Sequence, residues 1–167
     1  MLIREILASE PTQQQVIVTG WVRTRRQSKD FAFAEINDGS CLANLQIVAA
    51  PDRVDGYDEV MGRLNTGASV EVSGILMPSP GKGQSVEVHA EAIRVIGTAP
   101  ADDYPLQKKR HSFEFLRQIG HLRPRTNTFG AVTRVRNALA FAIHRFFQER
   151  DFLYVTTPII TTSDAEG

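Results

Sequence analysis

A cluster of basic side chains followed by two aromatic rings is the first feature of this sequence that could do chemistry. Its members are Arg23, Arg25, Arg26, Lys29, Phe31 and Phe33. Basic groups neutralise a phosphate backbone, and a flat ring stacks on an unpaired base for about 1–3 kcal/mol. The cluster therefore indicates a site for single-stranded nucleic acid. A solvated basic loop beside core phenylalanines is an equally good interpretation of these residues alone. The two rings are two residues apart, so they share one face of a strand. In the β-barrel that the strands predict (below), this face lies inside the barrel or at its mouth, and we expect one of the two rings in the core.

Polar residues further along the chain could add hydrogen bonds to base edges. Asn44 and Glu87 both fall within predicted strands, although each taken singly is better explained as an ordinary outward strand residue. His89, His111, His121 and His144 stand at spacings that suggest no ligand set, so we predict no metal site and interpret them as structural or surface groups.

Composition excludes several classes of protein. The 167 residues carry 19 basic and 19 acidic side chains, so no overall field favours a nucleic acid or a membrane, and any such partner must meet a local patch. Cys41 is the single cysteine, which excludes an internal disulfide or a thiolate zinc site. The sequence has neither a signal peptide nor the roughly 18 apolar residues of a membrane helix. We therefore expect a cytoplasmic protein that does not bind membranes.

The elements that must position these residues begin with a run of short strands. The sequence predicts strands over 16–22, 31–36 and 42–48, a short helix within 52–65, and strands over 69–77 and 85–96. Three strands, a helix and two strands are the order of the five-stranded OB-fold barrel, whose sheet face commonly binds oligonucleotides. An SH3-like barrel is the main competitor, but it does not usually place a helix before the fourth strand.

A second unit follows a change in charge. Residues 1–97 carry nine basic and twelve acidic side chains, whereas the remaining seventy carry ten basic and seven acidic ones. We predict a first domain over 1–97, a linker over 98–120, and a second unit over 121–167. Its apolar spacing predicts an amphipathic helix over 129–150, followed by a strand over 152–160. One helix and one strand cannot bury their apolar faces, so we interpret 121–167 as the start of a larger domain.

These motifs resemble a known family. Residues 20–26 (GWVRTRR) and 37–40 (NDGS) resemble the anticodon-binding domain of class IIb aminoacyl-tRNA synthetases. Motif 1 of that class is resembled by three consecutive parts of the chain: residues 121–127 (HLRPRTN), the helix with Arg134 and Arg136, and the run to Pro158. Residues 162–167 resemble the start of the amino-acid-binding segment of that class. The combination is most similar to the asparaginyl-tRNA synthetases of the bacterial type and covers essentially the whole chain. Its separate pieces are shared with the aspartyl and lysyl relatives, and an aspartyl relative stays an alternative.

The resemblance implies roles for particular residues. Phe33 would stack on the central anticodon base, Asn44 would read that base, Glu87 would contact the first base, and Arg26 would lie near the third or its backbone. Arg25 belongs to the same basic patch. Glu166 would receive the substrate ammonium group, with Ser163 beside it. Motif 1 is the dimer interface of the family, which implies a partner-facing role for Val132, Val135, Leu139, Ile143 and Pro158.

The resemblance also implies cofactors and partners. The full-length relatives join asparagine to tRNA(Asn) through an adenylate, using ATP and Mg²⁺, and act as homodimers. Their motifs 2 and 3, which hold ATP and magnesium, are missing here, so we expect no catalytic residue, no metal site and no activation of asparagine in this chain alone. A stand-alone OB-fold module that binds single-stranded RNA or a tRNA loop is the alternative function. A third interpretation, a protein that dimerises through 129–160, has less support.

Overall fold

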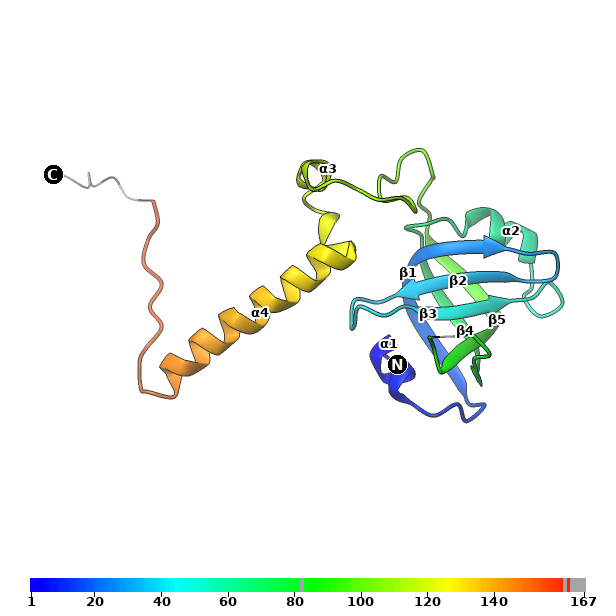
Figure 1. Ribbon diagram of the computed structural model, residues 1–167, viewed down its shortest axis with the longest axis horizontal. Coiled ribbons are helices and arrows are strands. Elements are labelled where there is room, and N and C mark those ends of the chain that lie inside the picture. Colours follow the sequence, from blue (N-terminus) through cyan, green and yellow to red (C-terminus); the bar gives the residue numbers. More distant parts are fainter. Residues whose placement is uncertain (82, 161, 163–167) are drawn as a thin grey trace.

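The computed structural model describes residues 1–81, 83–160 and 162. Five strands form a closed barrel in the order β1-β2-β3-β5-β4, with β3 and β5 parallel and the other neighbouring pairs antiparallel. The strands are β1 (Gln15–Gln27), β2 (Ala32–Asn37), β3 (Leu45–Ala49), β4 (Ser69–Pro78) and β5 (Val86–Gly97). Helix α2 (Tyr57–Arg63) connects β3 to β4. The predicted OB-fold is therefore confirmed (Figure 1).

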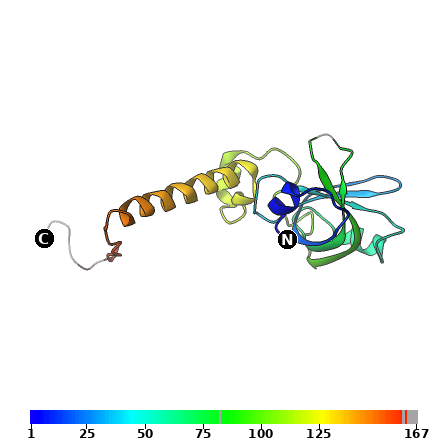
Figure 2. The same ribbon diagram turned by 90° about the horizontal axis from the view of Figure 1, so that it is seen from below.

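Strict alternation of side chains fills the barrel. Val16, Val18, Val22, Ala34 and Ile47 are among the residues that point inward and are buried. On β2 the inward positions are the small Ala32 and Ala34 followed by Ile36, so the two phenylalanines point outward. The expectation that one of them lies in the core is wrong, because alanines already fill the narrow interior at this level. Viewed from below, the strands curve round into a ring (Figure 2).

A short N-terminal helix that the sequence did not predict packs against the barrel. Helix α1 (Ile3–Ala8) contributes Ile3 and Ile6, both fully buried, to the main core. The Asp38 carboxylate on the turn after β2 accepts hydrogen bonds from the Ile3 N–H at 2.8 Å and from the Ser40 N–H and hydroxyl at 2.8 and 2.6 Å. Partial burial pushes the pKa of Asp38 upward, but these hydrogen bonds outweigh it and lower the pKa below its ordinary value.

Because the pKa of Asp38 is lowered, the stability of the barrel depends on pH under acidic conditions. The stabilisation is complete above the unfolded-state pKa of about 4 and is lost as the pH falls through the lower folded-state pKa. We expect the melting temperature of the wild type to fall more steeply than that of Asp38→Asn below about pH 4, measured by circular dichroism. Asp102→Asn, in the exposed linker, is the control. Parallel pH profiles for wild type and Asp38→Asn would contradict the role of this carboxylate.

The second unit is a long helix preceded by a folded connector. After β5 come α3 (Phe113–Gln118), a short 3-10 turn (Arg123–Arg125) and α4 (Asn127–Gln148), which Thr126 caps by accepting from the Phe129 N–H at 3.4 Å. Helix α4 extends away from the barrel (Figure 1), and its apolar stripe is exposed to solvent. The helix predicted over 129–150 is confirmed. Among the described residues, no helix has the length and apolar character to cross a bilayer.

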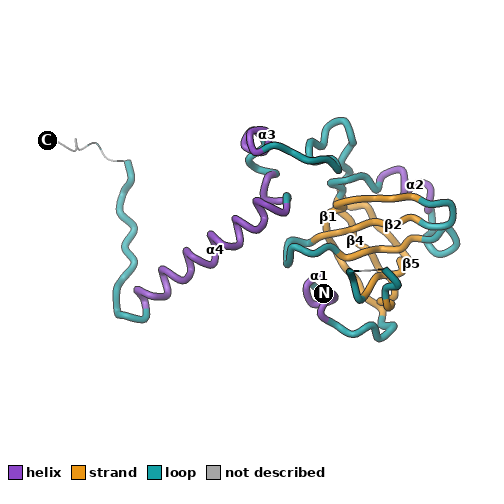
Figure 3. The backbone as a smooth tube through the Cα atoms, viewed as in Figure 1, coloured by secondary structure: helices purple, strands orange, loops and turns teal. Residues whose placement is uncertain are grey.

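The strand predicted over 152–160 is wrong. This segment contains no strand and its side chains are exposed, and Figure 3 draws it as loop. The described part of the chain offers it no neighbouring strand, and an extended segment needs one to satisfy its backbone groups.

Arginine contacts join the barrel to the start of α4. A register shift between Val22 and Thr24 makes Arg23 the extra residue of a β-bulge, which changes the direction of its side chain. The Arg23 guanidinium donates to the Arg125 carbonyl and to Asn127 Oδ1, the latter at 3.3 Å. The Arg125 guanidinium lies over the Trp21 ring, 4.8 Å from its centroid.

Candidate nucleic-acid interface on the outer face of the barrel

Four strands present one continuous row of side chains on the outer face. Arg26 on β1 pairs with Phe33 on β2, Phe33 pairs with Val48 on β3, and Val48 pairs with His89 on β5. Paired residues on neighbouring strands point to the same face. The row therefore places the Arg26 cation next to the Phe33 ring, and the His89 imidazole beyond Val48, on a partly exposed surface that we call the reading face.

The Phe33 ring is half-buried, outside the core. The Arg26 guanidinium carbon lies 5.2 Å from its ring centroid, and the Phe31 ring meets it edge-on with centroids 6.3 Å apart. Arg26 is itself exposed, so its long side chain is free to exchange the ring for a phosphate. A base that stacks on Phe33 either displaces this guanidinium or uses the opposite side of the ring.

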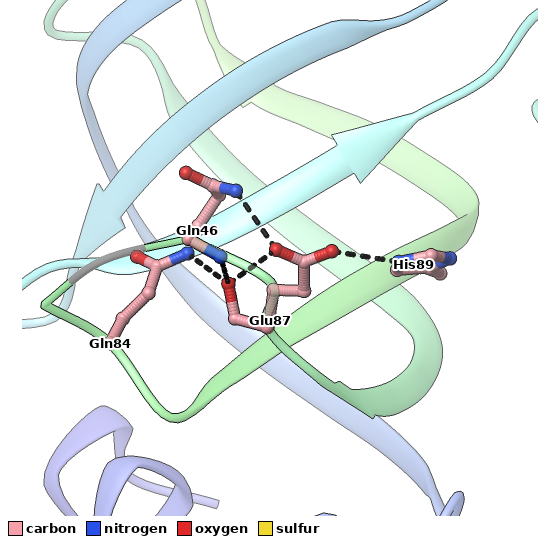
Figure 4. Close-up of polar contacts among 6 residues, drawn as sticks. Gln46, Gln84, Glu87 and His89 are labelled. Atoms are coloured by element: carbon pink, nitrogen blue, oxygen red, sulfur yellow. Dashed lines mark hydrogen bonds and ion pairs between the residues drawn. The ribbon is translucent and has the colours of Figure 1, made fainter.

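A second row, next to the first, is polar. Glu35 pairs with Gln46, and Gln46 Nε2 donates to Glu87 Oε2 at 3.0 Å. Glu87 is 5% exposed, and its carboxylate also binds His89 Nε2 through Oε1 at 2.9 Å. Figure 4 shows Gln46 and His89 converging on Glu87 from two sides. The buried carboxylate thus holds two partly exposed side chains at the edge of the aromatic platform.

Two of the residues predicted for this site are directed elsewhere. Arg25 pairs with the buried Ala34 on the opposite face, and its guanidinium donates to the carbonyl of Met61 in α2. Asn44 lies in the loop before β3, where its Nδ2 donates to Glu35 at 2.9 Å and its Oδ1 accepts from Asn37 at 3.2 Å. The structure therefore brings Arg26, Phe33 and Glu87 together, without Arg25, and binds Asn44 into the neighbouring turn.

Sequence reasoning missed Gln46 and His89 as members of the site. Starting the third strand at Leu42 drew attention to Asn44, whereas β3 begins at Leu45. The buried Leu45, Ile47 and Ala49 alternate with outward positions, which is the signal that could have found Gln46. His89 follows Glu87 by two residues on β5, so the same alternation could have placed it on the same face.

The remaining predicted residues lie on or beyond α4. Ser163 and Glu166 fall outside the described residues. On α4, Val132, Val135, Leu139 and Ile143 are 44–58% exposed, and Pro158 is exposed in the irregular segment that follows. Within the described ranges no three potential metal ligands gather.

Comparisons with known proteins agree with this geometry. Residues 16–96 match the model of the OB-fold nucleic acid binding domain. The chain is 62% identical to the asparagine–tRNA ligase of Nostoc sp. and 62% identical to that of Geobacter sulfurreducens, over 165 residues in each case. Each alignment covers 99% of this chain and 35% of the relative, so the chain spans about a third of the length of these curated relatives.

Solved structures give the same result. The asparaginyl-tRNA synthetase from Pyrococcus horikoshii, complexed with asparaginyl-adenylate, matches 98% of this chain and 37% of its own with a TM-score of 0.82 and 26% identity. The asparaginyl-tRNA synthetase from Entamoeba histolytica matches 94% of the chain and 38% of its own with a TM-score of 0.76 at 22% identity, which shows the shared fold. From its barrel, its sequence identity and its structural neighbours, this chain belongs to the asparaginyl-tRNA synthetase family.

Proposed function

We propose that this chain reads the anticodon of tRNA(Asn) for a ligase that joins asparagine to that tRNA. The observation that carries the proposal is the outward Phe33 ring, with Arg26 over it on one side and the Glu87 network beyond Val48 on the other. A stacking platform, a cation for the phosphate backbone and polar groups for base edges are what a splayed RNA loop requires.

Each part of the reading face supplies a different interaction. Phe33 stacks on a base, which the resemblance identifies as the central anticodon base. Arg26 neutralises the neighbouring phosphate, and the Glu87 network meets the polar edge of a base. Asn44 acts on this face only if its bonds to Glu35 and Asn37 are exchanged, whereas Arg25 stabilises the barrel through Met61. Stacking supplies affinity and the polar network supplies discrimination.

The rest of the proposal concerns the whole ligase. Residues 1–97 form the anticodon-binding domain, 98–120 the linker, and 121–167 the start of the catalytic domain, where Ser163 and Glu166 bind the amino acid. ATP and Mg²⁺ act in parts of the full-length protein outside this chain. The ligase works in the cytoplasm. The exposed stripe of Val132, Val135, Leu139 and Ile143, with Pro158, supports a homodimer formed through this segment.

Salt dependence tests the phosphate contact. We expect the chain to bind an anticodon stem-loop of tRNA(Asn) more weakly as salt rises, because each phosphate contact releases counterions. Arg26→Gln lowers the affinity and reduces the slope of log K against log salt by about 1, measured by fluorescence anisotropy between 50 and 200 mM salt. Arg94→Gln is the matched control, since Arg94 is an exposed arginine paired with Glu71 at 2.9 Å. Equal slopes for the two variants would count against Arg26, and no preference for the stem-loop over an unrelated loop would count against the proposed function.

A further inference from the structure

We propose that Arg23, Arg125 and Arg134 are positioning residues for the transfer of the amino acid to tRNA. They hold the barrel and α4 at the angle at which a tRNA bound by its anticodon presents its 3′ end to the catalytic domain. This inference rests on the proposed function and deepens it. It concerns the transfer step, and neither the reading of the anticodon nor the activation of asparagine.

Burial does not fix the angle between the barrel and α4. The main apolar core is made of residues between 3 and 93, and α4, all of whose residues the structure describes, buries none. Leu42 approaches the start of the helix, where a Cβ added to Gly130 would lie 3.5 Å from Leu42 Cδ2, but Leu42 is 47% exposed. Apolar burial has no preferred direction, and here it is small. The angle therefore depends on directional polar contacts.

The first of these contacts starts from the bulge of β1. Arg23 is the extra residue there, and its guanidinium donates both to the Arg125 carbonyl and to Asn127 Oδ1. The preceding residue, Val22, is bonded through its N–H and its carbonyl to the loop before β4, at 2.8 Å each. A planar guanidinium that meets two acceptors from a fixed backbone sets direction as well as distance.

The second contact runs in the opposite direction, from the second unit to the barrel. The Arg125 guanidinium carbon lies 4.8 Å from the centroid of the Trp21 ring on β1, and the same guanidinium donates to the Tyr104 hydroxyl at 3.4 Å. The Tyr104 ring lies directly on Gly67, where an added Cβ would come within 2.6 Å of the ring. The linker, the barrel and the turn before α4 therefore meet around one side chain.

The third contact lies further along the helix. Arg134 donates to the Gly39 carbonyl in the turn after β2. This turn is fixed in advance, because Asn37 Oδ1 accepts from the Gly39 N–H at 2.8 Å. Arg134 follows Asn127 by seven residues, about 10 Å along the helix axis. The contacts are thus spaced along α4 and reach two neighbouring strands, an arrangement that resists tilting of the helix.

The length of α4 makes its angle important. Only its start contacts the barrel, and it then extends away (Figure 1). Its 22 residues span about 33 Å at 1.5 Å per residue, so a tilt of about 10° at the start displaces the far end by about 6 Å. A misplacement of about 1 Å between reacting groups can cost about 100-fold in rate. The contacts should therefore matter most where the 3′ end of the tRNA must meet the activated amino acid.

The first measurement is the angle itself, in the 167-residue chain. Nitroxide labels are placed at Thr19→Cys, on the outer face of β1, and at Gln148→Cys, at the end of α4, in a Cys41→Ser background. Pulsed electron paramagnetic resonance then gives the distribution of distances between the labels. We expect a narrow distribution for this parent and a clearly broader one when Arg23→Gln and Arg134→Gln are added.

The control for the angle is Arg94→Gln, which removes an arginine that pairs with Glu71 at 2.9 Å within the barrel. It should leave the distribution unchanged. A distribution in the double variant as narrow as in the parent would overturn the inference, because the angle would then be held without these arginines.

The second measurement is a kinetic comparison in the full-length ligase that contains this chain. We expect Arg23→Gln to lower kcat for charging intact tRNA(Asn) by about tenfold or more. Binding of the anticodon stem-loop and asparagine-dependent ATP–pyrophosphate exchange should stay within about twofold of the wild type. Arg23→Lys keeps a cation and should recover part of the rate. Adding Asn127→Ala to Arg23→Gln should cause little further loss, because the two residues share one contact.

The outcomes separate this inference from the proposed function. If the wild type binds the anticodon stem-loop no better than an unrelated loop, the proposed function fails. If stem-loop binding is normal and Arg23→Gln leaves kcat unchanged, the inference is overturned. It is also overturned if the variant loses stem-loop affinity or pyrophosphate exchange to the same degree, since Arg23 would then contact RNA or only support the fold. Arg134→Gln, on the exposed surface of α4, repeats the comparison if Arg23→Gln does not fold.

Discussion

Replacing Phe33 with alanine is expected to weaken binding of the anticodon stem-loop by about 1–3 kcal/mol, about 5- to 150-fold. The ring lies on the outer face of β2, where Ala32 and Ala34 fill the interior, so its removal eliminates the stacking platform without opening a cavity in the core. A fluorescence-anisotropy titration of the chain with the stem-loop measures the loss, and thermal unfolding followed by circular dichroism checks that the barrel stays folded.

Two variants serve as controls for this result. Phe33→Trp keeps a flat ring and should bind within about threefold of the wild type. Phe141→Ala removes an exposed phenylalanine from α4 and should leave the affinity unchanged. An equal dissociation constant for the wild type and Phe33→Ala would exclude Phe33 as the stacking residue, whatever the salt titration shows.

The largest expected effect on stability comes from Gly74→Ala in β4. A Cβ atom at this position would lie 2.1 Å from the His89 carbonyl oxygen and 2.9 Å from the Ala90 Cα, and both are backbone atoms that cannot rotate away. Gly74 pairs with Ala90 next to a register shift, which shows how closely β4 and β5 approach here. We expect a loss of about 3 kcal/mol in the free energy of unfolding, measured by urea titration.

The matched control for Gly74 is Gly62→Ala in α2. Apart from its chain neighbours and the backbone of its own helix, no atom lies within 4 Å of the added Cβ there. Alanine in a helix is favoured over glycine by about 0.5–1 kcal/mol, so the control should gain stability. Because the clash falls on the carbonyl of His89, Gly74→Ala should also weaken binding of the stem-loop. A stable Gly74→Ala barrel with normal RNA affinity would show that β4 and β5 can separate at this point.

The composition of the strands made the barrel predictable. Runs rich in branched and aromatic residues, separated by turn residues, located all five strands, and the spacing of Tyr57, Val60, Met61 and Leu64 located α2. The segments that failed depend on neighbours. Helix α1 has only six residues and is held by burial of Ile3 and Ile6 in the barrel core, which no local pattern reveals. The segment 152–160 has strand-like composition, but strand formation depends on a neighbouring sheet.

The site was predicted in part for similar reasons. The resemblance singled out Phe33, Arg26 and Glu87, and the structure places them on one face. Local sequence could not decide which way the phenylalanines point, since this follows from how much space the barrel interior leaves. Nor could it reveal the bulge at Arg23, which puts Arg26 on the outer face and Arg25 on the inner one, because a register shift is a property of two strands together.

The contact of Arg23 with Arg125 and Asn127 has a consequence for protein engineering. Exchanging the barrel for that of a relative with another tRNA preference is an obvious route to altered decoding. The guanidinium of Arg23 and the ring of Trp21 belong to the barrel, whereas the carbonyl, the amide and the cation that they meet lie in residues 125–127. In a graft that stops at the end of β5, the two sides of this contact would come from different proteins. A functional chimera must therefore take both sides from the same protein.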